Sequence, residues 1–349
     1  VSARYRAYGW HVIDVAAASN GNVDITALDA AMVAAKKETT KPSLIRMKSV
    51  IAWPAPNAKG TAKSHGSALG DEEITATKKL LGIDPAETFF APKPVIEHTR
   101  KVRERGQKEH SLWLSEFNLW EKNNPERAAL LSRLTTKQLP SDWDKGIPVF
   151  SSEKEVATRA ASGKVIQYLA EQLPEFWGGS ADLAGSNNTS IKGGGSFLPA
   201  SSSIEGADPY GRIIHFGIRE HAMGSILNGI ALSGLTKAFA GTFAVFSDYM
   251  RPAVRLAALM KLPSTFVWTH DSIGLGEDGP THQPVEQLWS LRSIPGFAVV
   301  RPCDANEVAV CWLKIMEDRK PAGIVLTRQN IPTLDRKINA PAIKAQKGA

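Results

Sequence analysis

Short apolar runs alternate with segments of helical spacing through most of the chain, and this alternation restricts the fold more than any other feature of the sequence. In the second half, apolar runs at residues 176–181, 237–242, 264–269 and 322–327 are separated by segments with apolar residues at helical intervals. Strands that alternate with helices form parallel sheets covered by helices. We therefore predict an α/β fold with a doubly wound, mostly parallel sheet flanked by helices.

The same pattern divides the chain, whose 349 residues suffice for about two domains. A strand–helix–strand unit and a run of polar helices occupy residues 1–134, which we interpret as the end of one domain with a helical extension. We predict a linker at residues 135–152, a second α/β domain at residues 153–335, and the start of a further domain at residues 336–349. Both ends are expected to belong to a longer protein.

Two local predictions concern the segments between these regular elements. Residues 95–134 are expected to be largely helical, with an apolar stripe that anchors packing, made of Leu112, Trp113, Phe117 and Trp120. Residues 182–210 are rich in glycine and serine, and we predict one long loop there.

Composition narrows the class of protein. Cys303 and Cys311 are its two cysteines, which is too few for a disulfide framework and favours a cytoplasmic location. No run of about 18 apolar residues is present, so we expect no membrane partner. The formal charge of +7 is compatible with a nucleic-acid partner. No nucleic-acid motif accompanies it, however, and a small anionic substrate explains it equally well, so we expect no nucleic-acid partner.

The loop at residues 269–286 concentrates chemically useful side chains. It follows an apolar run at residues 265–268 and holds two His, two Asp and two Glu among glycines and prolines. Open α/β sheets bind ligands at loops that follow the carboxyl ends of their strands. We therefore consider His270, Asp278 and His282 candidate ligand contacts, against the alternative of an ordinary solvated loop.

Other candidates follow neighbouring strands. Glu220 begins a helix, where it either caps the first turn or acts as a functional acid. Phe243, Phe246 and Tyr249 are three residues apart and share a face if this stretch is helical, forming either core or a slot for a flat heteroaromatic ring. The remaining candidates are weaker on spacing alone: Asp182 and Ser186 after a strand, Arg159 and Arg328 as phosphate contacts or structural ion pairs, and His65 in an early loop.

With these residues assembled, the chain resembles transketolase. The resemblance covers the end of the diphosphate-binding domain, a helical linker and the whole pyrimidine-binding domain. It implies a thiamine-diphosphate-binding fold and an enzyme that transfers a two-carbon ketol unit from xylulose 5-phosphate to ribose 5-phosphate or erythrose 4-phosphate in the pentose phosphate pathway. The motifs that carry it lie at residues 178–183, 217–224, 241–243, 270–284 and 328–330.

The resemblance implies a role for each candidate near the cofactor. Glu220 would hydrogen-bond the pyrimidine ring of thiamine diphosphate and promote its imino form, Phe246 would stack on that ring, and Phe243 and Tyr249 would wall it. Asp182 would lie near the thiazolium ring.

The resemblance also implies roles toward the sugar phosphate. Asp278 and His282 would bind donor hydroxyls, with His282 near the reacting carbon, and His65 would transfer a proton. The phosphate would be held by Arg159, Ser186, His270 and Arg328.

The chain departs from the family pattern at its ends. The metal motif, Gly-Asp-Gly followed by Asn, does not occur, so the Mg²⁺ ligands are expected upstream of residue 1. A homodimer with active sites at the subunit interface is implied. The alternatives are a related thiamine diphosphate enzyme, such as a dihydroxyacetone synthase, and a non-catalytic fragment that keeps the fold.

Overall fold

The computed structural model describes residues 1–348, which form two compact units, Val1–Glu116 and the residues from Phe117 onward. The first unit contains two parallel strands in register from His11 opposite Ser43 to Val15 opposite Met47. The Asp24 side chain caps the intervening helix by accepting a hydrogen bond from the Ala27 amide at 2.9 Å, as the sequence predicted. The elements are α1 Ser2–Ala7, β1 His11–Val15, α2 Ile25–Lys37, β2 Ser43–Met47, η1 Ala62–Ser64 and α3 Asp71–Leu80.

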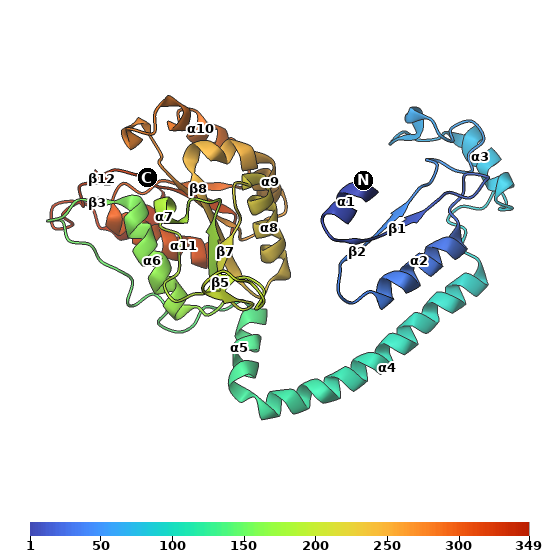
Figure 1. The fold of residues 1–349 in the computed structure, drawn as a ribbon, viewed down its shortest axis with the longest axis horizontal. Helices are drawn as coiled ribbons and strands as arrows, with labels where there is room; N and C mark the ends of the chain where they lie inside the picture. The colour runs from blue at the N-terminus through green and yellow to red at the C-terminus, as the bar shows by residue number, and fades with distance from the viewer. Residues whose placement is uncertain (349) are drawn as a thin grey trace. The chain divides into compact units, whose positions relative to one another are not determined.

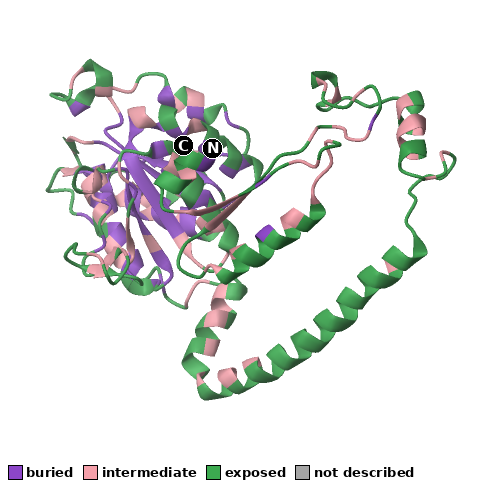
Figure 2. Ribbon diagram, turned by 45° about the vertical axis from the view of Figure 1, so that its right-hand side comes forward, coloured by how far each residue is buried: buried purple, intermediate pink, exposed green. Residues whose placement is uncertain are grey.

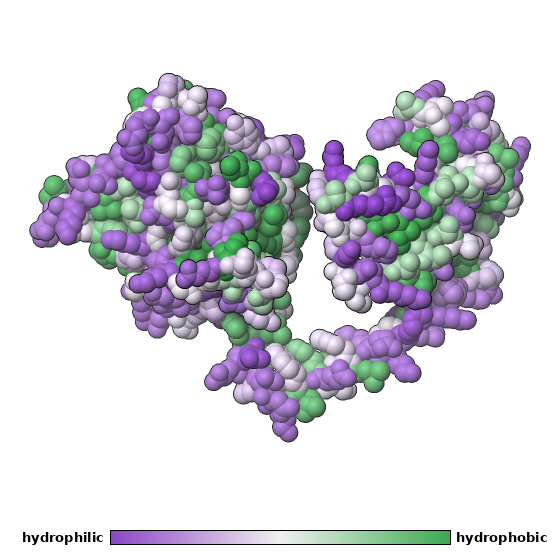
Figure 3. Space-filling view, in the orientation of Figure 1, coloured by the Kyte–Doolittle hydropathy of each residue, from purple (hydrophilic) through white to green (hydrophobic). Residues whose placement is uncertain are grey.

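A long helix, α4 (Lys93–Asn123), follows, and Pro125 begins the next helix, α5 (Pro125–Thr135). No residue of α4 is buried, and its exposed surface is visible in Figure 2. Leu112 and Trp113 are more than half exposed, and hydrophobic residues lie among hydrophilic ones on this helix in Figure 3. The prediction that this stripe anchors packing is therefore wrong for Leu112 and Trp113 within the described residues.

The second unit is built on an eight-stranded sheet with the order β10-β11-β9-β8-β4-β7-β5-β6. Every neighbouring pair in it is parallel, which confirms the predicted fold class. A separate antiparallel pair joins β3 (Val156–Ala157) to β12 (Asn330–Ile331). The sheet strands are β4 Phe176–Ser180, β5 Ser196–Phe197, β6 Ala207–Asp208, β7 Ile213–His215, β8 Lys237–Phe243, β9 Thr265–Thr269, β10 Ala298–Val300 and β11 Ala322–Val325.

Helices cover both faces of this sheet (Figure 1). One face carries α6 (Thr158–Gln172) and α11 (Ala305–Asp318), and the other carries α8 (Glu220–Ser233), α9 (Ser247–Leu259) and α10 (Gln287–Arg292). Successive side chains of a strand point to opposite faces, so β8 contributes to both cores. Phe239 packs with Phe176 and Trp312 on the first face, while Ala238 and Ala240 pack on the second.

The glycines of β4 allow the central strands to approach closely. A Cβ atom on Gly179 would lie 1.8 Å from the carbonyl oxygen of Ile214, and one on Gly178 would lie 2.3 Å from that of Phe239. Neither backbone oxygen can move without breaking a strand pairing, so the Gly-Gly sequence is a packing requirement of the sheet centre.

The prediction of one long loop at residues 182–210 is wrong. This segment contains α7 (Ala184–Asn187) and the strands β5 and β6, which extend the sheet. Each of these strands has two residues and lies in a stretch rich in glycine and serine, so no alternation of apolar and polar residues marks them. Pairing with β7 makes β5 a strand, and pairing with β5 makes β6 a strand; both contacts are tertiary.

The segments on either side of the second α/β region pack on its core. Trp143 and Phe150 are buried there, and the Asn306 side chain hydrogen-bonds both the amide and the carbonyl of Phe150 at 2.9 Å. After β12, Arg336 pairs with Asp304 at 2.6 Å, and η5 (Ala342–Lys347) lies against α11. The predicted terminal segment at residues 336–349 includes residue 349, which lies outside the described residues. No helix in the described part of the chain is both long and apolar enough to cross a membrane.

Candidate active site

The carboxyl ends of the parallel strands share one edge of the sheet, and the candidate residues of the second unit follow those ends. Asp182 comes after β4, Glu220 after β7, His270 after β9 and Arg328 after β11, while Phe243 is the last residue of β8. This is the edge where open α/β sheets bind ligands. The topology therefore brings residues more than one hundred positions apart to the same edge.

An aromatic group forms the centre of this edge. The rings of Phe243 and Phe246 stack with centroids 5.6 Å apart and 7° between their planes, and Tyr249 lies 5.9 Å from Phe246. The three-residue spacing thus places the side chains together. His282 meets both phenylalanines edge-on, at 5.4 Å from Phe246 and 6.1 Å from Phe243. Phe246 is only half-buried and Tyr249 is exposed, so the group offers aromatic surface to a ligand.

His270 is the most constrained of the candidates. It is 2% exposed, adopts a left-handed backbone conformation (φ 60°), and stacks on Phe243 with ring centroids 3.7 Å apart. Its Nδ1 lies 2.8 Å from the Thr269 hydroxyl, and its Nε2 lies 3.9 Å from Asp278 Oδ2. Burial, reinforced by the positive charge of Arg159, lowers the pKa of His270 to about 4. The ring is therefore neutral at neutral pH, and its contact with Asp278 is not an ion pair.

Three buried polar residues hold His270, and the sequence reasoning missed all of them. Ser180 donates to the Gly241 carbonyl at 3.0 Å, Asn187 Nδ2 donates to Ser180 Oγ at 2.8 Å, and Thr269 Oγ1 donates to Asn187 Oδ1 at 2.6 Å. A serine and a threonine as the last residues of otherwise apolar strands were the available signal. Their buried hydroxyl groups need partners.

The two arginines lie close enough to influence each other. Arg159 donates from Nη1 to the Ser186 carbonyl at 2.6 Å, and burial followed by the charge of Arg328 lowers its pKa. Arg159 pairs with no carboxylate among the described residues, whereas Arg328 pairs with the exposed Glu277. Asp278 acts on Arg159 only through its charge, and the partner of Arg328 is exposed, so the two guanidinium groups still suit a bound anion. Ser186 contributes its carbonyl oxygen to Arg159, and its exposed side chain makes no hydrogen bond within the described chain.

Glu220 is the first residue of α8 and is 8% exposed. Its carboxyl group has no hydrogen bond or ion pair among the described residues. Its carboxyl oxygens are not among the fully buried atoms without a partner, so they still reach solvent and are open to a ligand. The first turn of a helix also favours negative charge there.

Two further candidates form no side-chain hydrogen bond or ion pair among the described residues. Asp182 is exposed and holds a left-handed backbone conformation (φ 58°), directly after β4. His65 belongs to the first unit, where it is exposed and follows η1. The second unit therefore does not itself bring His65 to the site.

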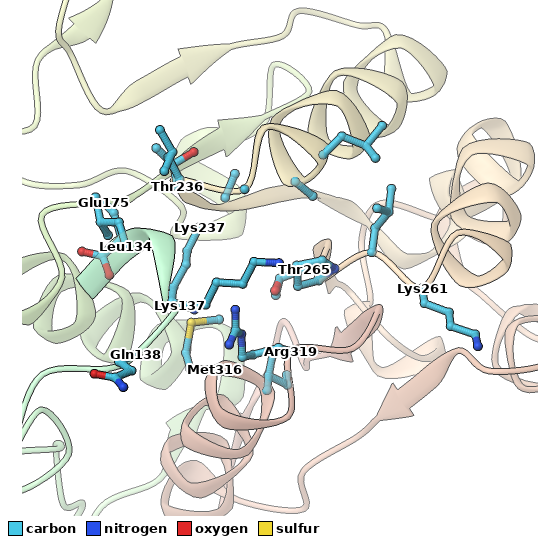
Figure 4. A pocket seen from close by; sticks show the side chains of 18 residues that line it. Leu134, Lys137, Gln138, Glu175, Thr236, Lys237, Lys261, Thr265, Met316 and Arg319 are labelled. Atoms are coloured by element: carbon cyan, nitrogen blue, oxygen red, sulfur yellow. The ribbon is translucent and has the colours of Figure 1, made fainter. Parts of the chain in front are cut away.

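A cavity of about 240 Å³ lies at the opposite edge of the sheet, where the strands begin (Figure 4). Lys237 at the start of β8, Lys137 and Arg319 line it, and burial followed by the charge of Arg319 lowers the pKa of Lys237. The helices α8, α9 and α11 end there, and cations complement the negative ends of helix dipoles. The basic residues are thus explained without a ligand, and no predicted site residue lines this cavity.

Groups of three or more His, Cys, Asp or Glu that could hold a metal ion do not occur among residues 1–348. The site at the carboxyl edge of the strands therefore consists of an aromatic surface, a neutral histidine, a buried unpaired acid and two arginines.

Comparison with known proteins relates this site to one family. The model of the thiamine diphosphate binding domain of transketolase matches residues 1–140, and that of the transketolase pyrimidine binding domain matches residues 154–333. The transketolase of Mycobacterium tuberculosis is 54% identical over 340 residues, covering 96% of this chain and 48% of the relative. That of Bacillus subtilis is 45% identical over 351 residues, covering 100% of this chain and 51% of the relative.

Solved structures agree. A variant of the Pichia stipitis transketolase in complex with fructose 6-phosphate superposes with a TM-score of 0.91 at 42% identity, covering 99% of this chain and 50% of that one. The Leishmania mexicana transketolase gives a TM-score of 0.88 at 34% identity, covering 98% and 49%. The chain thus spans about half the length of the curated relatives it matches. Since the two family models together match most of its residues, the chain belongs to the transketolase family.

Proposed function

We propose that the protein containing this chain is a transketolase, which uses thiamine diphosphate and Mg²⁺ to move a two-carbon ketol unit from a ketose phosphate to an aldose phosphate. The observation that carries the proposal is the buried, unpaired Glu220 at the same sheet edge as the stacked Phe243 and Phe246 rings. Identity of 54% to a curated transketolase supports it. Xylulose 5-phosphate as donor, and ribose 5-phosphate or erythrose 4-phosphate as acceptor, belong to the proposal.

The residues present fit this cofactor. Thiamine diphosphate supplies, when bound, the carbon nucleophile that carries the two-carbon unit. The Glu220 carboxyl would hold a proton at a nitrogen of the pyrimidine ring, which gives this buried acid the partner that the chain does not provide. Phe246 would stack on the ring and Phe243 and Tyr249 would border it, because their rings already lie together with one open side. Asp182 would lie near the thiazolium ring.

The substrate would use the remaining candidates. Arg159 and Arg328 would bind the phosphate, which supplies the anion that the two guanidinium groups favour. Ser186 and His270 would contact the same phosphate. Asp278 and His282 would bind donor hydroxyl groups, with His282 near the reacting carbon and beside the aromatic surface. His65 would transfer a proton from the first unit.

The assembly around this site is also part of the proposal. The Mg²⁺ ligands would come from protein sequence outside this chain, and two subunits would build each site. Exposed leucines of α4, such as Leu112 and Leu119, support a partner surface. A cytoplasmic location is supported by two free cysteines, one of them exposed, because free thiols persist in reducing compartments.

Ketol transfer by the full-length protein tests the proposal. Turnover of xylulose 5-phosphate with ribose 5-phosphate is measured with and without thiamine diphosphate and Mg²⁺, and we expect it only with both present. A preference for a one-carbon aldehyde acceptor, which yields dihydroxyacetone, would instead indicate a dihydroxyacetone synthase. Cofactor binding without any ketol transfer would mean a non-catalytic member of the fold.

A further inference from the structure

Four hydrogen bonds link a backbone carbonyl of β8 to the ring of His270, and their directions can be assigned in order. The Gly241 carbonyl only accepts, so Ser180 Oγ gives its single hydrogen to it at 3.0 Å. Ser180 must then accept from Asn187 at 2.8 Å, which places the amide nitrogen of Asn187 on that side. The amide oxygen of Asn187 therefore faces Thr269, and Thr269 donates to it at 2.6 Å.

The order of donors determines which nitrogen of His270 carries the hydrogen. Thr269 has already given its only hydrogen to Asn187, so its oxygen must accept from His270 Nδ1 at 2.8 Å. Nδ1 is thus protonated, and Nε2 keeps a lone pair. Ser180, Asn187 and Thr269 are each at most 4% exposed, so water does not substitute for a member of this relay.

The surroundings of Nε2 keep the ring neutral until an anion arrives. Arg159 of α6, Arg328 after β11 and His282 of the following loop all disfavour a positive charge on His270, and Asp278 favours it. Burial is the largest cause of the shift, and together with these charges it lowers the pKa of His270 to about 4. The Asp278 carboxylate, at 3.9 Å, is too distant to hydrogen-bond Nε2.

A phosphate bound beside the two arginines would lie near this lone pair, because the charges of both arginines act on His270. Phosphate oxygens of a dianion accept hydrogen bonds, as does Nε2, so a direct contact between them requires a hydrogen that neither supplies. An opposite charge within hydrogen-bond range raises a histidine pKa by roughly 1–3 units, and a phosphate dianion brings nearly two charges.

We propose that Asn187 and Thr269 are positioning residues that hold His270 as its Nδ1–H tautomer, so that a sugar phosphate binding beside Arg159 and Arg328 takes up one proton from solvent. The proton forms a bond with the lone pair of Nε2 and is shared with a phosphate oxygen, and no bond of the sugar breaks. The inference rests on the proposed function, because that function supplies the phosphate. It adds that phosphate affinity is coupled to pH through a relay that starts in the sheet.

Calorimetry measures this proton directly. Full-length protein with thiamine diphosphate and Mg²⁺ is titrated with ribose 5-phosphate at pH 7, without a ketose donor, in buffers of different ionisation enthalpy. The dependence of the binding heat on that enthalpy gives the number of protons taken up. We expect about one half proton for the wild type, because a rise of about 3 units brings the pKa of His270 from about 4 to the pH of the titration, and none when unphosphorylated ribose is the ligand.

A matched pair of variants at position 269 tests the relay. Thr269→Ser keeps the hydroxyl and should take up as many protons as the wild type. Thr269→Val removes the hydroxyl. The ring then adopts the Nε2–H tautomer and donates to the phosphate with the hydrogen that it already carries, so this variant should take up close to no protons. A purely structural role for Thr269 would weaken binding without changing the proton count.

The outcomes distinguish a failure of the proposed function from a failure of this inference. Failure of the wild type to bind ribose 5-phosphate overturns the proposed function, and the inference with it. Binding without proton uptake overturns the inference alone, and equal uptake by Thr269→Val overturns the positioning role. If Thr269→Val does not fold, the ¹⁵N chemical shifts of the His270 ring in the wild type test the tautomer instead. These signals are assigned by their loss in His270→Gln and by their change in Asn187→Leu. An unprotonated Nδ1 there contradicts the proposal.

Discussion

The imidazole of His270 stacks on the ring of Phe243 with centroids 3.7 Å apart and 24° between their planes. This contact joins the last residue of β8 to the first residue after β9, and it covers one side of the histidine. Because these neighbouring strands are parallel, their carboxyl ends lie together, and the loops that follow them meet. The stack thereby connects the aromatic surface proposed for the cofactor to the arginines proposed for the phosphate.

Replacement of Glu220 by alanine should lower kcat for ketol transfer at least about 10²-fold, the usual loss when an acid–base group is removed. Because the carboxyl has no partner in the described chain, the melting temperature should change little. Steady-state kinetics and thermal unfolding of the full-length protein measure the two effects. The exposed Glu205→Ala is the control, and an unchanged kcat in Glu220→Ala would exclude the assigned role.

Replacement of Arg328 by alanine should raise KM for phosphorylated sugars while leaving kcat nearly constant, since the guanidinium would hold the phosphate equally in the ground and transition states. Its ion pair with the exposed Glu277 contributes little stability, so folding should not suffer. Arg319→Ala, at the opposite edge of the sheet, is the matched control. An equal rise in KM for an unphosphorylated donor would argue against phosphate binding.

The buried His270 should make the protein less stable in mild acid. Its pKa is about 4 in the folded state and about 6.5 in an unfolded chain, so the unfolded state binds the proton more readily between these values. Its contribution is fully present above pH 6.5 and is lost as the pH falls toward 4, by about 3 kcal/mol. Thermal unfolding from pH 7 to 4 should therefore fall more steeply for the wild type than for His270→Asn. Parallel curves for the two proteins would show that another group controls the acid response.

Gly179→Ala should prevent normal packing of the sheet centre, because its Cβ would lie 1.8 Å from the Ile214 carbonyl oxygen. We expect a loss of more than about 3 kcal/mol, in the range of severe overpacking. Gly106→Ala in α4 is the control, because a Cβ there meets nothing within 4 Å, and it should stabilise the helix by up to about 1 kcal/mol. Chemical denaturation measures both, and similar stabilities for the two variants would contradict the close approach.

Asp304→Ala should weaken both α11 and the segment that follows β12. The Asp304 side chain is fully buried, caps the helix through the Glu307 amide at 2.8 Å, and accepts hydrogen bonds from Leu334 and Arg336. Loss of the cap costs about 1 kcal/mol. Loss of the charged hydrogen bond to Arg336, which is partly exposed and keeps Glu307 at 3.6 Å, adds about 2 kcal/mol. Asp304→Asn retains an acceptor for the cap and should lose less. Amide exchange at Glu307 and Leu334 distinguishes the two effects.

Much of the fold could be predicted because its signals are local. The apolar run at residues 264–269 predicts β9 within one residue, and Asp24 predicts the start of α2. The parallel arrangement then follows from strand–helix alternation alone. The short strands β5 and β6 could not be predicted, because two residues carry no periodicity. β5 joins the sheet only through β7, and β6 joins it only through β5. Leu112 was misjudged for a related reason: an apolar stripe indicates a face that can pack, and not whether the same chain covers it.

The sequence by itself determined the sheet edge at which the candidate site residues lie and the residue types found there, because the motif residues of 217–224 and 270–284 directly follow predicted strands. The tertiary structure decided the state of those residues. Ser180, Asn187 and Thr269 come from separate segments, and only their contact orients the hydrogen bonds that end at His270. Burial and the nearby cations then keep that ring neutral. Periodicity is set by neighbours along the chain, whereas the direction of a hydrogen bond and the charge of a buried group depend on every atom around them in space.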